Sequence, residues 1–316
     1  MGSRVFCRSR ALRDYIIKKT FLALLTILGV IVGTFLLLFL AKDPATTLAP
    51  PEATAQDIAK LRESMRLDDP LFIQTARFVW SVAKLDLGIS YINRQPVMNL
   101  ILERISASFE LTLAAFILYV CFSIPIGMIS AVKRFSWIDN VATSISLIGQ
   151  AMPIFWLGIM LIIIFGIKLQ ILPISGRGDP LNLILPSVTL GAFLMPLGMR
   201  LTRSAMIDAI SQDYIRTAKA KGLSAFGIYF KHAAKNAILP VITALFVQMG
   251  VLLSGAVVTE TVFAWPGLGR LATTAIMAGD YPLVRALVLL FTVFVVMANL
   301  MGDIIIAYLD PRVRLK

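Results

Sequence analysis

The sequence is poor in charged residues. Only 15% of its 316 residues are Asp, Glu, Lys or Arg, whereas 58% are hydrophobic, and the mean hydropathy is +0.83. A water-soluble domain of this length would have to expose much of that apolar surface to water. The composition therefore excludes an ordinary soluble domain and indicates a chain that resides in lipid.

Side chains that commonly hold metals or carry out chemistry are also rare. The chain has two cysteines, Cys7 and Cys121, and one histidine, His232. We expect no disulfide or metal site, because Cys7 falls in a tail expected in the cytoplasm and Cys121 falls within a predicted helix. No cluster of His, Cys, Asp or Glu in the apolar runs supplies a nucleophile with its base, which argues against an intramembrane hydrolase. The phosphate loop G-x-x-x-x-G-K-[ST] is absent, so the chain is not itself predicted to be an ATPase.

Long apolar runs are present instead. A helix needs about 20 residues to cross the ~30 Å hydrocarbon core of a bilayer. Five runs of about that length contain no charged residue, and a sixth contains only Asp303. These runs are continuously apolar, which favours helices over the short alternating strands of a barrel. We therefore predict an all-α integral membrane protein with six transmembrane helices, at residues 21–41, 111–132, 141–167, 181–199, 236–259 and 286–309.

The net charge of +12 follows the predicted topology and does not point to nucleic acid. Basic residues gather before the first run, between the second and third, after the fourth and at the C-terminus, whereas the short loops after the third and fifth runs hold few. By the positive-inside rule both termini are predicted to lie in the cytoplasm. Contact between the basic loops and anionic membrane lipid is a secondary expectation. The first run is too long for the apolar part of a signal peptide, so we expect it to remain as an anchor.

The longest hydrophilic stretch, residues 42–104, is expected outside the membrane. It contains eight basic and eight acidic residues and so has no net charge. Apolar residues recur at helical spacing on both sides of Asp68-Asp69-Pro70, which predicts two short amphipathic helices packed on the outer rim. The segment could act as a cap on the bundle or as a docking surface for an external partner, and its residues leave both open.

Several apolar runs contain a proline near a glycine, around Pro125, Pro153, Pro186 and Pro196. Such residues occur where membrane helices bend or where irregular backbone lines a cavity. Together they favour a transporter over a simple anchor.

Between the fourth and fifth runs the sequence predicts two helices joined by a sharp bend, which we call the elbow (about residues 205–236). Gly222 suits the left-handed position after a helix, because glycine accepts positive φ without a Cβ clash. Leu223 is expected to add an apolar contact, and Ser224 is a good N-cap for the second helix. A projecting elbow can fit a groove of another protein; an ordinary helical connection is the alternative. The first helix is predicted from a mostly apolar stripe at Ile207, Ile210, Tyr214, Ala218 and Lys221.

The elbow resembles the cytoplasmic coupling loop of ABC importer permeases, specifically of the dipeptide/oligopeptide/nickel permease family. The resemblance rests on D-Y-x-R-T-A-x-A-K-G at residues 213–222 and H-A-x-x-N-A-x-x-P at residues 232–240. The broader importer pattern has Glu-Ala-Ala where Arg216, Thr217 and Ala218 stand, a departure that the peptide family shares. Similar stretches follow the family's order at residues 86–90, 153–156, 202–204, 260–269, 280–282 and 310–312. The resemblance covers nearly the whole chain and is most specific from about Ser106 onward.

This resemblance implies a bacterial inner-membrane subunit with the bundle of a type I importer permease. Residues 1–105 would form the tail, first transmembrane helix and periplasmic region, and residues 106–316 the permease core. A second homologous permease would complete a path for peptides or similar small solutes, and a periplasmic or lipid-anchored binding protein would deliver the solute. Two cytoplasmic ABC ATPase subunits would bind the ATP, so no cofactor is expected in this chain. The residues implied to contact an ATPase are Arg216, Thr217, Ala218, Lys219, Lys221, Gly222, Leu223, Ser224 and His232.

Charges inside a membrane are costly and often mark a path through it. Asp303 within the sixth run and Glu260 at the outer end of the fifth are candidates for the path or a gate. Partner-satisfied carboxylates near the headgroups are the alternative. The turn Trp265-Pro266-Gly267 is a candidate for an external gate, or else for an interfacial aromatic anchor.

The main alternative function is an ion-coupled secondary transporter. Such proteins usually place paired acidic residues or broken helices near the midplane, and only Asp303 is predicted to lie that deep. A purely structural scaffold would leave the elbow and the outer turn unexplained. Relatives implied by the resemblance handle peptides, glutathione-like thiols, nickel chelates, opines and some sugars, and their selectivity rests largely with the binding protein.

Overall fold

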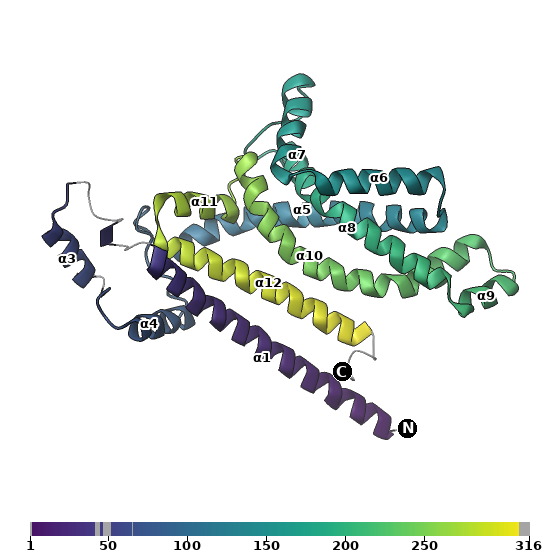
Figure 1. Ribbon diagram of the computed structural model, residues 1–316, viewed down its shortest axis with the longest axis horizontal. Coiled ribbons are helices and arrows are strands. Elements are labelled where there is room, and N and C mark those ends of the chain that lie inside the picture. The colour runs from purple at the N-terminus through teal and green to yellow at the C-terminus, as the bar shows by residue number, and fades with distance from the viewer. Residues whose placement is uncertain (1, 42–44, 47–51, 65, 310–316) are drawn as a thin grey trace.

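Figure 1 shows a computed structural model that describes residues 2–41, 45–46, 52–64 and 66–309. Over these residues the chain is almost entirely helical, and its single extended pairing is an isolated antiparallel bridge between Ile89 and Pro96. The predicted all-α class is confirmed. The side chain of Cys7 and the family-like stretch at 310–312 lie outside what is described.

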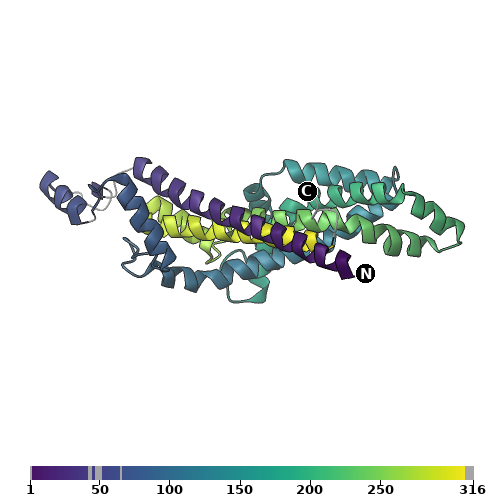
Figure 2. The same cartoon turned by 90° about the horizontal axis from the view of Figure 1, so that it is seen from below.

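Five long helices run roughly along the long axis of the molecule (Figures 1 and 2): α1 (Gly2–Ala41), α5 (Val97–Val132), α8 (Ile184–Ile210), α10 (Ala234–Val262) and α12 (Tyr281–Leu309). Helix α8 packs against α5 and α10, α12 packs against α10, and α1 lies against α12. The shorter elements are α3 (Ala55–Ser64), α4 (Leu71–Ala83), α6 (Trp137–Ala151), α7 (Ile154–Leu161), the π-helix η1 (Ile162–Lys168), the 3-10 turn η2 (Pro180–Leu183), α9 (Asp213–Ala220), the π-helix η3 (Gly227–Ala233) and α11 (Leu268–Ala278).

The molecule has two distinct ends. Helix α9 lies at one end and α3 and α4 lie at the other (Figure 1). Helix α1 begins, and α12 finishes, on the side of α9. We call these the α9 end and the α4 end. The alternation of the helices agrees with the predicted one, and which end faces the cytoplasm stays a prediction.

The described helices include five that are long and apolar enough to cross a membrane: Arg13–Leu36, Val97–Val132, Pro180–Ile210, Gly227–Leu252 and Tyr281–Ile305. The predicted span at 141–167 is not one helix. It is broken between α6 and α7, and the two parts make an angle of 104°. Counting this bent pair as one span gives the six that the sequence predicts.

Pro153 explains the break. Met152 and Pro153 are both extended, with ψ of 128° and 137°. A proline disfavours helical backbone at the residue before it, so α6 cannot continue through Met152. In contrast, Pro125 and Pro196 lie inside α5 and α8, which continue past them. Helix α7 therefore projects from the side of the bundle (Figure 1).

The two short helices predicted in residues 42–104 are present as α3 and α4. The Thr54 backbone and hydroxyl both donate to the Asp57 carboxylate ahead of α3, and these bonds hold the pKa of Asp57 below its ordinary value. Helix α3 buries none of its residues. Helix α4 contacts α1, where the Phe78 and Phe35 rings stack with centroids 5.8 Å apart. Packing on the rim therefore holds for α4 only.

Two clusters of buried apolar residues fix the ends of the bundle. We call the first the elbow cluster; it joins α5, α8, α9, η3 and α10 through Ala131, Met206, Ala209, Ile215, Ala218, Ile228, Ala233 and Ala237. We call the second the α11 cluster; it joins α5, α11 and α12 through Val97, Leu100, Ile101, Leu268, Ala272, Ala275, Leu283, Ala286 and Leu287. A third cluster, which includes Leu111, Tyr119, Leu190 and Leu252, joins α5, α8 and α10 between them.

Candidate functional site

The bend of the elbow is set by Gly222. Its φ is 73°, and its N–H donates to the Lys219 carbonyl at 3.0 Å. The next N–H, of Leu223, donates to the Ala218 carbonyl at 3.4 Å. This pair of bonds is the glycine-dependent way of ending a helix that the sequence predicts. A Cβ on Gly222 would meet no atom within 4 Å, so the requirement for glycine is conformational and not steric.

Ser224 begins the second arm of the elbow, as predicted. Its hydroxyl accepts a hydrogen bond from the Gly227 N–H at 3.2 Å, which satisfies a donor of the new helix. The arm then continues as the π-helix η3 and passes into α10 without a break. A π-helix was not predicted from the sequence, because the spacing of its residues does not distinguish it from an α-helix.

The predicted first arm was wrong in two details. A single helix over residues 207–221 was expected, but α8 ends at Ile210 and α9 begins at Asp213, with Gln212 extended between them. This break shifts the buried face. Ile215 is 1% exposed, whereas Tyr214, which the stripe placed inside, is 38% exposed.

The base and the tip of the elbow differ in burial. Ile215 and Ala218 are part of the elbow cluster, so the base is fixed to α5, α8 and α10. At the tip, the Phe226 and Phe230 rings stack 4.9 Å apart, and Phe226 is 74% exposed. Leu223 is also exposed, at 44%, and its predicted local apolar contact stays a prediction. The remaining predicted contact residues are exposed around the tip: Arg216, Thr217, Lys219, Lys221, Gly222, Ser224 and His232. Ala218 is the exception and is buried.

Phe226 and Phe230 were not among the predicted contact residues, because the sequence alone does not show which apolar residues of the second arm stay exposed. Their i, i+4 spacing is the signal that could have identified them, since residues four apart on a helix lie on the same face. The elbow is therefore an anchored projection with an apolar tip and a basic rim.

The turn Trp265-Pro266-Gly267, which we call the outer turn after its predicted side, is built around Glu260. This residue is fully buried at the end of α10. Its carboxylate accepts hydrogen bonds from the Ser108 hydroxyl and from the N–H groups of Gly269, at 2.7 Å, and Arg270, at 3.0 Å. The Leu268 N–H in turn donates to Ser108 at 2.7 Å. A carboxylate at the first turn of α11 satisfies the free N–H groups of that helix and favours its dipole.

Trp265 lies inside the protein. It is 1% exposed, and its indole N–H donates to the Ala107 carbonyl at 2.9 Å. The alternative of an aromatic anchor at the lipid interface is therefore wrong for this residue. Gly267 is buried beside it, where a Cβ would come within 2.2 Å of the Glu260 carboxylate. Pro266, between them, is half-buried.

Asp303 faces α1. The Lys19 ammonium lies 2.9 Å from its carboxylate, and each side chain is about one third exposed, at 35% for Lys19 and 32% for Asp303. The sequence assigned Lys19 only to the basic tail, because nothing in it shows that α1 packs along α12. The structure does not bring Asp303 together with Glu260, because Asp303 pairs with Lys19 between α12 and α1, whereas Glu260 contacts α5 and α11.

Helices α6 and α8 are joined by an ion pair that the sequence did not predict. The Arg203 guanidinium donates to both oxygens of Asp139, at 2.7 and 2.8 Å. Asp139 is 2% exposed and also accepts from the Ser130 hydroxyl of α5 and the Phe135 N–H. Arg203 falls in the stretch Thr202-Arg203-Ser204 that the resemblance singled out, and its contact explains why an arginine stands there.

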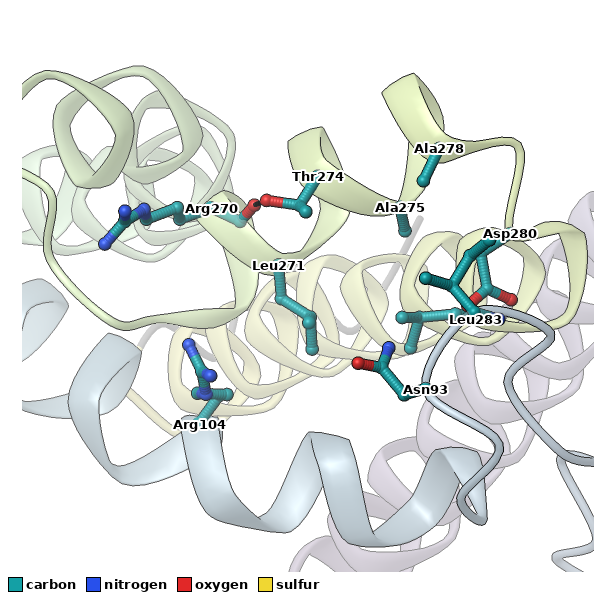
Figure 3. A pocket seen from close by; sticks show the side chains of 10 residues that line it. Asn93, Arg104, Arg270, Leu271, Thr274, Ala275, Ala278, Asp280 and Leu283 are labelled. Atoms are coloured by element: carbon teal, nitrogen blue, oxygen red, sulfur yellow. Dashed lines mark hydrogen bonds between the residues drawn. The ribbon is translucent and has the colours of Figure 1, made fainter.

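A cavity of about 320 Å³ opens at the α4 end between α5, α11, α12 and the loop at residues 89–96. Its polar lining residues are Asn93, Arg104, Arg270, Thr274 and Asp280, and its apolar ones are Ile92, Leu271, Ala275, Ala278 and Leu283. In Figure 3 Arg104 and Arg270 lie toward one end and Asn93 and Asp280 toward the other. The sequence did not indicate this pocket, because its residues come from four separate segments.

Two family models match the chain. One is described as the inner membrane component of binding-protein-dependent transport systems and matches residues 123–315. Its N-terminal companion matches residues 12–112. The fold is also similar to that of the MetNI methionine ABC transporter in inward-facing conformations, with a TM-score of 0.56 and 19% identity over 67% of this chain and 97% of that chain.

Curated relatives are similar along nearly their whole length. The glutathione transport system permease protein GsiC of Salmonella paratyphi A is 40% identical over 304 residues, which are 96% of this chain and 99% of the relative. The protein of the same name from Escherichia coli is 38% identical over the same shares. The chain therefore belongs to the family of inner membrane components of binding-protein-dependent transport systems, and it is a multi-pass transport permease, not a member of an enzyme family.

Proposed function

We propose that this permease forms the path of an ABC importer together with a second homologous permease. Two ATPase subunits on the cytoplasmic side hydrolyse the ATP, and the chain itself has no catalytic activity. A binding protein on the other side delivers the cargo. The name of the curated relatives favours glutathione or a similar small peptide as that cargo. The α9 end faces the cytoplasm, with both termini.

The elbow is the observation that carries this proposal. Its tip exposes Leu223, Phe226 and Phe230 beside basic residues, and an apolar patch with a charged rim is typical of a protein interface. Its base is held in the elbow cluster, so a force on the tip reaches α5, α8 and α10 without being lost in a flexible loop. Arg216, Lys219 and Lys221 contribute more to the orientation of the ATPase subunit on the elbow than to its affinity for the elbow.

The contacts of the outer turn favour a role as a rigid part of an external gate over a role as a polar lining of the path. The Glu260 carboxylate accepts hydrogen bonds from Ser108 and from two N–H groups of α11. Trp265 and Gly267 are buried in the same turn. We infer that α10, the turn at Trp265, Pro266 and Gly267, and α11 move as one body when the outer side opens or closes. Asp303 stabilises the contact of α12 with α1.

The proposal is tested by uptake into vesicles that contain the complete transporter. We expect the chain to co-purify with its ATPases, and Gly222→Trp to abolish ATP-driven uptake while the chain still inserts in the membrane. The reason is that a bulky side chain at positive φ strains the bend by about 1–3 kcal/mol. Gly222→Asn is the matched control, because asparagine tolerates this conformation, and it should keep most of the uptake. Normal uptake by Gly222→Trp would contradict the coupling role.

An ion-coupled secondary transporter is supported less well. Asp303, its one deep acidic candidate, is paired with Lys19 at the contact of two helices and is not clustered with other carboxylates. Uptake by the purified chain with an ion gradient and without an ATPase would favour that function and overturn ours.

A further inference from the structure

Arg104 is one of the cations that line the pocket of Figure 3. Its side chain is half-buried on α5, and among the residues that the structure describes none accepts a hydrogen bond from it or pairs with it. Its neighbour Glu103 is exposed and makes no ion pair with it. A guanidinium that is partly removed from water gains from an anion that binds both of its edges.

The pocket has an excess of positive charge. Arg270 is held in place because its guanidinium donates to the Ala264 carbonyl at 2.7 Å, and that neutral acceptor leaves its charge uncompensated. Asp280 is the single acidic lining residue, and it is already engaged. It accepts from the Ser90 hydroxyl and from the N–H groups of Tyr91, at 3.1 Å, and Ile92, at 3.4 Å.

The walls of the pocket are fixed before any ligand arrives. The hydrogen bonds of Asp280 hold the 89–93 loop against the start of α12. Glu260 holds the start of α11, and the bond from the Leu268 N–H to Ser108 joins α11 to α5. Little ordering would be needed on binding, which favours affinity.

One side of the pocket borders the packed interior of the protein. Ala275 and Leu283 on its floor belong to the α11 cluster and are 3% and 1% exposed. A solute that entered here would meet a packed core instead of a route to the other end. The site is therefore suited to hold a group that docks and leaves again, and not to conduct cargo.

We propose that this pocket receives an acidic side chain of the binding protein, whose carboxylate pairs with Arg104 and Arg270 when that protein docks at the α4 end. This inference rests on the proposed function, in which a binding protein approaches this end. The volume of about 320 Å³ has room for one such side chain with water. The contact fixes the position of the binding protein on the permease. It also makes the affinity between the two proteins depend on the salt concentration.

The test measures the affinity of the binding protein encoded with this chain for the complete transporter in lipid nanodiscs. Arg104→Gln is expected to raise the Kd roughly tenfold or more, because a charged contact loses one partner, and to flatten the dependence of the Kd on salt. Arg104→Glu should weaken binding further, and reversing the matching acidic residue of the binding protein should restore it. That rescue distinguishes a direct contact from a folding defect.

Lys84→Gln is the matched control, because Lys84 is an exposed cation of the same outer region that does not line the pocket; its Kd should be unchanged. Equal affinities for Arg104→Gln and the unchanged chain would overturn this inference alone. Altered binding of free glutathione to the transporter, with unaltered docking of the binding protein, would also overturn it. A transporter that never binds the binding protein would overturn the proposed function as well.

Discussion

At the scale of single residues, the buried position of Glu260 requires a glycine at position 267. The carboxylate can stay buried because Ser108 and two backbone N–H groups surround it, which compensates for its loss of water. Gly267 is what leaves room for it, since any Cβ there would overlap the carboxylate. The sequence motif at residues 260–269 is thus explained by the packing of one acid against one glycine.

Gly267→Ala should destabilise the outer turn. The added Cβ would lie 2.2 Å from Glu260 Oε1, and the carboxylate cannot move away without breaking its hydrogen bonds. We expect a loss of about 1–3 kcal/mol, as for other overpacked sites, measured as a lower melting temperature in detergent. Gly29→Ala, where a Cβ would meet nothing within 4 Å, is the control and should melt as the unchanged chain does. Equal melting temperatures for the two variants would refute this account.

Among the helices, α6 is bound to α8 by an ion pair near its start and is ended by a proline. Asp139 near its start is bound to Arg203 of α8, whereas Pro153 after its end turns the chain by 104° into α7. In the sequence, Pro125 and Pro196 could not be distinguished from Pro153, because each lies near a glycine in an apolar run. Only at Pro153 does the chain leave the bundle, because there two consecutive residues are extended.

Removing one partner of the Asp139–Arg203 ion pair should lower the stability of the protein, because the other charge is then left without its partner. Arg203→Ala would leave a buried carboxylate without its counter-charge, and we expect it to lower the free energy of unfolding by about 3 kcal/mol. The double variant Asp139→Ala with Arg203→Ala should lose less than the sum of the two single losses. Unfolding in mixed micelles of increasing denaturing detergent measures all three variants. Strictly additive losses would show that the two residues do not interact.

On the scale of the whole molecule, the two proposed functional regions lie at opposite ends. The elbow lies at the α9 end, and the outer turn and the pocket with Arg104 lie at the other (Figure 1). Helix α5 contributes residues to all three clusters of buried apolar residues, and α8 and α10 contribute to two of them. A change of shape at one end can therefore reach the other through rigid elements.

This arrangement predicts opposite labelling of two single cysteines. Met277 of α11 is 84% exposed and Phe226 of the elbow 74%, and α10 lies between them in the chain. In a background with Cys7→Ser and Cys121→Ser, Met277→Cys should react with an impermeant maleimide from outside intact spheroplasts. Phe226→Cys should react only after permeabilisation, since basic loops stay inside. The reversed pattern would invert the topology and remove the elbow from the ATPases.

The composition and the apolar runs by themselves determined that the chain is a bundle of membrane helices, because the length and hydrophobicity of a span are properties of consecutive residues. Gly222 and Ser224 could be assigned in advance for the same reason, since a helix end depends on its own few residues. The partners of Asp303, Asp139 and Glu260, the buried place of Trp265, and the pocket beside Arg104 were decided only by the tertiary structure. Each of these brings together residues far apart in the chain, and their meeting depends on how the helices pack.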